Sequence, residues 1–336
     1  MEIKFFLSDN EMAPTTISGK LFANALKESG YSVEIIQSKD EKKRLLRTGG
    51  CDVIFFQKCF YEGHRCEDVR HLKGKVTLIY IDDDFMEMDD KSHIDTLNIA
   101  DLIIVGNKAH AERLKEYTDN PCESVYTLTD YKNYSYTSFE DRNNNPLIIY
   151  WGKNLADVYI DDLLMVKEPL DMIYKEYGTE VRLYGWHQGK HYGLADKTPI
   201  IKEAFPYAKC IPFQAEKIYI KELVPKIAKS DICIAPCLDI PDRYGKSGFG
   251  IKHTMLLGVP VIASNLGIHQ ELIQDGETGF LASTGKEWYE KLEKLILQPA
   301  LRKKFSVNAR NLMETKYNHI KCVDVFINAV KKHVLL

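Results

Sequence analysis

Residues 245–264, GKSGFGIKHTMLLGVPVIAS, combine a lysine and a serine with three closely spaced glycines and then run into an apolar stretch. Small residues at Ser247, Gly248 and Gly250 let the backbone approach a ligand closely. Free N–H groups at the start of a helix carry partial positive charge that suits phosphate oxygens, and Lys246 adds a full charge. The pattern favours a phosphate-binding loop, while a glycine-rich turn with a solvated lysine is the alternative.

Two common nucleotide-binding motifs do not fit this chain. Lys246 lacks the earlier glycine that a P-loop places before its Gly-Lys-Ser. No GxGxxG follows the first predicted strand, which argues against a nicotinamide dehydrogenase. The loop must therefore be interpreted from the elements that position it.

Short apolar runs alternate with segments of helical character along the chain. Such alternation predicts parallel β-sheets that are covered by helices on both faces. The predicted strands are IKFFLS, YSVEIIQ, DVIFFQ, VTLIYID, ADLIIVG, PLIIYWG, VRLYG, SDICIAP and VPVIAS. The expected fold class is α/β, with two doubly wound, Rossmann-like domains that face a central cleft and bind ligands at the carboxyl ends of their strands.

The length of 336 residues suits two domains. The stretch DYKNYSYTSFEDRNNNP, residues 130–146, is rich in Tyr and Asn, has no apolar period and ends in a proline, which is typical of a domain boundary. We expect a first domain over 1–145 and a second over 146–310. Terminal helices are expected over 311–336.

Composition and charge exclude several classes of protein. The formal net charge is −3, so the chain has no overall basic footprint for an anionic polymer. No apolar stretch approaches the roughly 18 residues that span a bilayer, and the start MEIKFFLSDNEMAP does not look like a signal peptide. The eight cysteines form no CxxC pair, which suits reduced thiols and gives no support to a zinc site. We expect a cytoplasmic protein.

The opening stretch resembles the GT-B-fold retaining glycosyltransferases of group 1, which use nucleotide-sugar donors. In one branch of that group a Lys-Ser loop is followed by a glutamate seven residues after the lysine and by Gly-Val-Pro twelve residues after it. Lys246, Ser247 and the Gly-Val-Pro at 258–260 fall at these spacings, with His253 in the place of the glutamate. The resemblance continues through VIASNLGIHQELIQDGETGFL, where the matching positions are Gly267, Glu271, Gly276, Gly279 and Phe280.

The resemblance implies a donor site in the second domain. Lys246 would hold the donor diphosphate together with backbone amides near Ser247 and Gly248, and Lys153 would be its companion. His253 would stand where a glutamate usually binds the ribose hydroxyls, and a histidine can still hydrogen-bond a hydroxyl. The remaining donor-side positions are Gly185, near the base, with Gly267 and Glu271.

An acceptor side is implied in the first domain, with the terminal helices crossing back to pack on it. Gly19, in the loop after the first strand, would face the donor phosphates and the acceptor. Asp83 and Asp84, in the acidic run IDDDFMEMDD, would contact the acceptor, or else belong to a solvated loop. His64 is a candidate general base, with a surface histidine as the alternative. We expect no metal site, because GT-B enzymes as a class do not depend on one.

The function implied is transfer of a sugar from a nucleotide diphosphate donor to an acceptor hydroxyl, with retention at the anomeric carbon. A UDP-sugar is favoured as donor, a GDP-sugar is an option, and no tightly bound cofactor is expected. A GT-B sugar-nucleotide epimerase and a non-catalytic nucleotide-sugar-binding partner are the alternatives. The acceptor is left open among a glycan, a lipid-linked sugar and a nucleic-acid base. The basic run KDEKKRLLR, residues 39–47, leaves room for a peripheral contact with the inner membrane surface.

Overall fold

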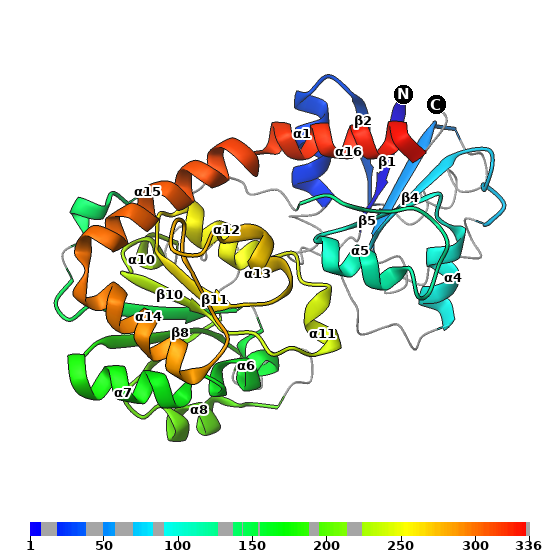
Figure 1. Ribbon diagram of the computed structural model, residues 1–336. Coiled ribbons are helices and arrows are strands. Elements are labelled where there is room, and N and C mark those ends of the chain that lie inside the picture. The colour runs from blue at the N-terminus through cyan, green and yellow to red at the C-terminus, as the bar shows by residue number, and fades with distance from the viewer. Residues whose placement is uncertain are drawn as a thin grey trace. The chain divides into compact units, whose positions relative to one another are not determined.

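The computed structural model of the protein describes residues 1–7, 19–37, 50–57, 70–82, 91–126, 137–142, 144–153, 155–187, 195–213 and 224–333. The chain divides into two compact units, coloured from blue to red along the sequence in Figure 1. The first unit is formed by Met1–Asp130, Ile240–Ser247 and Tyr317–Leu336. The second unit is formed by Tyr131–Asp239 and Gly248–Lys316.

The first unit is built on a parallel six-stranded sheet of order β2-β1-β3-β4-β5-β6. Its strands are β1 (Glu2–Phe6), β2 (Ser32–Ile36), β3 (Val53–Gln57), β4 (Thr77–Asp82), β5 (Leu102–Val105) and β6 (Cys122–Ser124). The described helices of this unit are α1 (Phe22–Glu28), α4 (Lys91–Ile99), α5 (Lys108–Leu114), α11 (Pro241–Tyr244) and α16 (His319–His333).

Aromatic side chains join the C-terminal helix α16 to the core of the first unit. Phe326 packs edge-on against Phe22 of α1, with ring centroids 4.9 Å apart, and against Phe55 of β3 at 5.8 Å. The helix lies beside α1 in Figure 1. At its last turn, Lys332 and His333 both bond to the carboxylate of Glu123 in β6. The last helix is therefore part of the first unit, although α15, which precedes it in the sequence, belongs to the second.

The second unit is built on another parallel six-stranded sheet, of order β12-β11-β10-β7-β8-β9. Its strands are β7 (Ile148–Gly152), β8 (Glu180–Trp186), β9 (Lys209–Pro212), β10 (Ile232–Ala235), β11 (Val261–Ser264) and β12 (Phe280–Ala282). Its α-helices include α6 (Ile160–Leu164), α7 (Lys167–Tyr177), α8 (Thr198–Ala204), α10 (Val224–Ala228), α12 (Phe249–Leu256), α13 (Gly267–Leu272), α14 (Gly285–Leu297) and α15 (Pro299–Lys316).

One buried arginine fixes the start of the second unit. The guanidinium of Arg142 donates hydrogen bonds to the carbonyl oxygens of Ala228, Leu257 and Gly258 and to that of Thr137. These carbonyls lie near the ends of α10 and α12, where the last carbonyl groups of a helix have no partner within the helix. Residues 137–142 are thus attached to the second unit by a charged group with several backbone partners.

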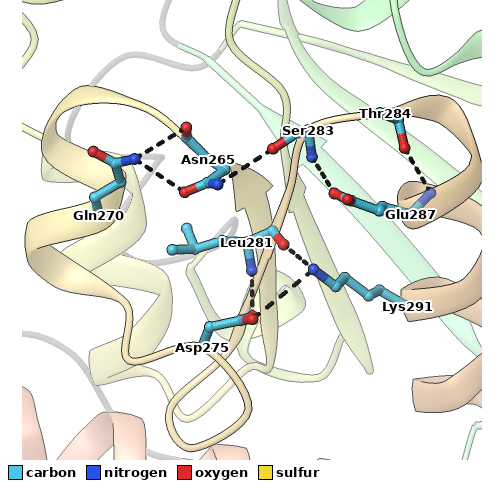
Figure 2. A network of polar contacts seen from close by, with 8 residues as sticks. All are labelled: Asn265, Gln270, Asp275, Leu281, Ser283, Thr284, Glu287 and Lys291. Atoms are coloured by element: carbon cyan, nitrogen blue, oxygen red, sulfur yellow. Dashed lines mark hydrogen bonds and ion pairs between the residues drawn. The ribbon is translucent and has the colours of Figure 1, made fainter.

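A network of polar contacts surrounds β12, the edge strand of the second sheet (Figure 2). Thr284 caps α14 by accepting from the amide of Glu287, whose carboxylate accepts in return from the amide of Ser283, the residue before the N-cap. Asp275 accepts from the amide of Leu281, and Lys291 bonds to the carbonyl of Leu281. The GETGF part of the sequence motif therefore builds a turn that is attached to β12.

These two sheets confirm the predicted fold class, an α/β fold of two doubly wound parallel sheets. All nine predicted strands are present. Among the helices in the described part of the chain, none has the length and apolar character needed to cross a membrane.

Candidate active site

Polar side chains follow three strands of the second sheet at its carboxyl edge. Lys153 follows β7, His187 follows β8, and His269 lies in the first turn of α13, just after β11. The carboxyl ends of parallel strands meet at one edge of a sheet, which is where open α/β sheets bind their ligands. A donor site is therefore expected at this edge.

Lys153 and Gly185 are neighbours at this edge, because the ends of β7 and β8 lie side by side. The amide of Lys153 donates to the carbonyl of Tyr184. Gly185 has a φ of +102°, and a β-carbon there would overlap the carbonyl oxygen of Lys153. Only glycine fits, so Gly185 allows the backbone of Lys153 to pass. The ammonium group of Lys153 lies 4.9 Å from the ring centroid of Tyr159. The proposed contact of Gly185 with a base stays a prediction.

Helix α12 begins at the same edge with the features expected of a phosphate-binding loop. Its N-cap is Gly248, in the left-handed conformation with φ +67°, and no side chain caps the first turn. A β-carbon on Gly248 would lie 2.5 Å from Leu272 and 2.8 Å from Ile268, so the start of α12 packs closely against α13. The first N–H groups of such a helix have no partner within the helix and suit an anion.

Helix α12 is held in place by Tyr150 of β7, whose hydroxyl bonds to that of Thr254. Next to Thr254, His253 is only 3% exposed and its ring centroid lies 5.9 Å from that of Phe249. Burial lowers the pKa of His253 to about 3, so the ring is neutral near pH 7. The structure thus places His253 in the interior of the second unit, and its contact with a ribose stays a prediction.

A second buried histidine, His269, was not selected by sequence reasoning. Its Nδ1 lies 3.0 Å from the carbonyl oxygen of Ser264, the last residue of β11, and the side chain is 6% exposed. Burial, together with the positive charge of Lys153, lowers the pKa of His269 to about 4. The residue stands between Gly267, which opens α13 with φ +51°, and the half-buried Glu271. Its signal was its place inside the glycosyltransferase-like motif.

Lys246 and Ser247 belong to the first unit. The side-chain amide of Asn107, just after β5, donates to the carbonyl oxygens of Tyr244 (2.7 Å) and Lys246 (3.0 Å). A β-carbon on Gly106 would lie 2.7 Å from that of Ser247, so the two backbones touch closely. The guanidinium of Arg113 stacks 3.9 Å from the ring centroid of Tyr244. The segment 240–247 is therefore fixed to β5 and α5.

The predicted site residues fall into three groups. Those of the second unit are Lys153, Gly185, Gly248, His253, Gly267 and Glu271. Those of the first unit are Lys246, Ser247 and Gly19, and Gly19 is buried against the side chain of Leu7. His64, Asp83 and Asp84 lie outside the described residues. Their shared site stays a prediction, and the residues that the structure describes contain no cluster suited to a metal ion.

Comparison with known proteins relates one part of the chain to a family. A family model described as glycosyl transferases group 1 matches residues 217–312. Alpha-D-kanosaminyltransferase from Streptomyces kanamyceticus is 28% identical over 99 residues, which are 29% of this chain and 25% of that protein. The match thus spans about a quarter of the length of the curated relative.

Solved structures share the fold over nearly the full length. Sucrose-phosphate synthase from Thermosynechococcus elongatus has a TM-score of 0.73 at 12% identity, covering 99% of both chains. HepE from Anabaena, in complex with UDP and glucose, has a TM-score of 0.71 at 16% identity, covering 99% of this chain and all of that one. Two such sheets with flanking helices form the GT-B fold of these structures. Residues 217–312, which include α12 and α13, match the glycosyl transferases group 1 family, in agreement with the resemblance to that group seen in the sequence.

Proposed function

We propose that the protein transfers a sugar from a UDP-sugar to an acceptor hydroxyl, with retention at the anomeric carbon. The observation that carries this proposal is the carboxyl edge of the second sheet. The uncapped start of α12 and the side chain of Lys153 both belong to the second unit. The choice of UDP is supported by HepE, which has been solved with UDP and with UDP-glucose.

The reaction requires stabilisation of the negative charge that builds on the leaving diphosphate. In the proposed mechanism the N–H groups of α12 and Lys153 bind the diphosphate from the second unit, and Lys246 adds a charge from the first. The bond between the anomeric carbon and the phosphate oxygen breaks while the acceptor oxygen bonds to the same carbon on the same face. The acceptor proton moves to the leaving phosphate, so no protein nucleophile is needed.

The acceptor is a glycan, a lipid-linked sugar or another hydroxyl compound, presented in the cytoplasm or at the inner membrane surface. No observation favours an epimerase or a non-catalytic binding partner over a transferase. A GDP-sugar is the second choice of donor.

A thermal-shift screen of UDP-, GDP-, ADP- and dTDP-sugars tests the donor, because a ligand that binds the native state raises the melting temperature. We expect the largest shift with a UDP-sugar. Incubation with that donor alone should give slow hydrolysis at most, and addition of an acceptor should release UDP with a new glycoside of retained configuration. Conversion of the donor to its epimer would replace the proposal with an epimerase, and binding without turnover on any acceptor would replace it with a binding protein.

A further inference from the structure

We propose that His269 is the hydrogen-bond acceptor for a hydroxyl group of the bound donor, a specificity-determining contact that rests on the proposed function. The residue lies in the first turn of α13, at the same sheet edge as Lys153 and the start of α12. The ring nitrogen that carries the proton decides which kind of ligand group the other nitrogen can bind.

The backbone fixes the tautomer of His269. Nδ1 lies 3.0 Å from the carbonyl oxygen of Ser264, and a carbonyl can only accept a hydrogen bond. Nδ1 must therefore carry the proton. The pKa of His269 is lowered to about 4, so the ring does not gain a second proton near pH 7. Nε2, on the opposite side of the ring, is left with a lone pair and can only accept.

Within the described residues, Nε2 is an acceptor without a hydrogen-bond partner on a side chain that is almost wholly buried. His269 is 6% exposed, and within the described part of the chain Nε2 makes no hydrogen bond. Buried polar groups are normally satisfied, and an acceptor held in this way points to a ligand that donates a hydrogen bond.

The chemistry of Nε2 selects the ligand group. A neutral imidazole nitrogen without a proton accepts from an O–H group and offers nothing to a phosphate oxygen. Lys153, whose positive charge acts on the ring, has the opposite preference. Lys153 therefore binds the phosphates of the donor, and His269 binds a hydroxyl of the ribose or of the transferred sugar.

Titration calorimetry with UDP and UDP-glucose tests the contact in the variant His269→Leu, which removes the acceptor from a chain whose folding is checked by its melting temperature. Loss of one neutral hydrogen bond should weaken binding about three- to tenfold. A loss for UDP-glucose alone would assign the hydroxyl to the transferred sugar, and an equal loss for both ligands would assign it to the ribose. The variant His269→Gln, which keeps an acceptor, should recover part of the affinity.

Two controls separate binding from structure. Gln270→Ala, on the same short helix, removes only contacts to Asn265 and should leave both affinities unchanged. The side-chain ¹⁵N spectrum of the wild type should show the Nδ1–H tautomer for His269 and a shift of the Nε2 signal when UDP-glucose is added. Normal wild-type binding with no change in His269→Leu would overturn the inference alone. A wild type that binds no nucleotide sugar would overturn the proposed function, and the inference with it.

Discussion

Gly185 and Lys153 illustrate how a single atom can set the position of a charged group. Replacement of Gly185 by alanine places a methyl group on the carbonyl oxygen of Lys153 in a backbone conformation that alanine rarely adopts. We expect Gly185→Ala to lower the free energy of unfolding by about 2–4 kcal/mol and to lower activity further by displacing Lys153. Urea denaturation and turnover of the folded fraction would measure both. The matched change Gly178→Ala, also at positive φ but with open space around it, should cost less stability and no activity.

Lys246 is the residue whose removal should affect the rate most at the least cost to folding. Its side chain is half-buried, and its carbonyl, not its ammonium group, makes the contact to Asn107. A lysine on a leaving diphosphate contributes a few kcal/mol to the transition state, so Lys246→Ala should lower kcat/KM by about 10²-fold. Lys115→Ala, at an exposed lysine of the first unit, is the control. An unchanged rate in folded Lys246→Ala would remove this residue from the site.

At the scale of elements, the segment 240–247 depends on the turn between β5 and α5. Asn107 accepts from the amide of His110 as the N-cap of α5 and donates to two carbonyls of the segment. Asn107→Ser keeps a capping oxygen but removes the amide donor. We expect faster hydrogen exchange in residues 244–247, unchanged exchange in α5, and reduced turnover. Equal exchange in wild type and variant would show that the two bonds do not restrain the segment.

Helices α12 and α13 should make the protein sensitive to acid. His253 and His269 have pKa values lowered to about 3 and about 4, so below pH 6.5 the unfolded chain binds protons that the folded chain does not. Stability is then complete above pH 6.5 and falls as the pH drops toward 4. Between pH 6.5 and 5, each histidine should remove about 2 kcal/mol from the free energy of unfolding. Urea denaturation across this range should show that His269→Gln loses about 2 kcal/mol less of its free energy of unfolding than the wild type does. Equal losses in the two proteins would contradict the lowered pKa of His269.

The sequence was a good guide to elements with a strong local pattern. Buried parallel strands such as β5 and β10 appear as apolar runs, because helices cover both faces of their sheets. The short strands β6, β9 and β12 were not predicted, since three or four residues such as CES or KCIP carry no recognisable period. Partners far apart in sequence were also missed. Asn107 bonds to Tyr244 and Lys246, which lie 137 and 139 positions further along the chain. The pKa of His269 is lowered by burial and by the charge of Lys153, a residue more than a hundred positions earlier.

For the whole molecule, the division of site residues between two units predicts a change of shape. If the second unit holds the donor while Lys246 acts from the first, the productive complex requires the units to close around the reactive sugar and exclude water. We expect a smaller radius of gyration in small-angle scattering at saturating donor. Identical profiles with and without donor, in a protein that turns over, would show that closure is not part of the mechanism. Truncation at Asn311, which removes α16 and Phe326 from the core of the first unit, should destabilise that unit.

The short segment 240–247 has a consequence for anyone who recombines this protein with its relatives. Chimeras of two-domain enzymes are commonly made by joining halves at a single crossover in the linker, on the assumption that each half is self-contained. Here the chain passes from one unit to the other at 130/131, 239/240, 247/248 and 316/317. A transplanted second half would bring a foreign loop against Asn107 and Gly106. The fit there is tight, because a β-carbon on Gly106 would lie 2.7 Å from that of Ser247. A working hybrid must therefore exchange 102–114 and 240–247 as a matched pair, together with the last helix.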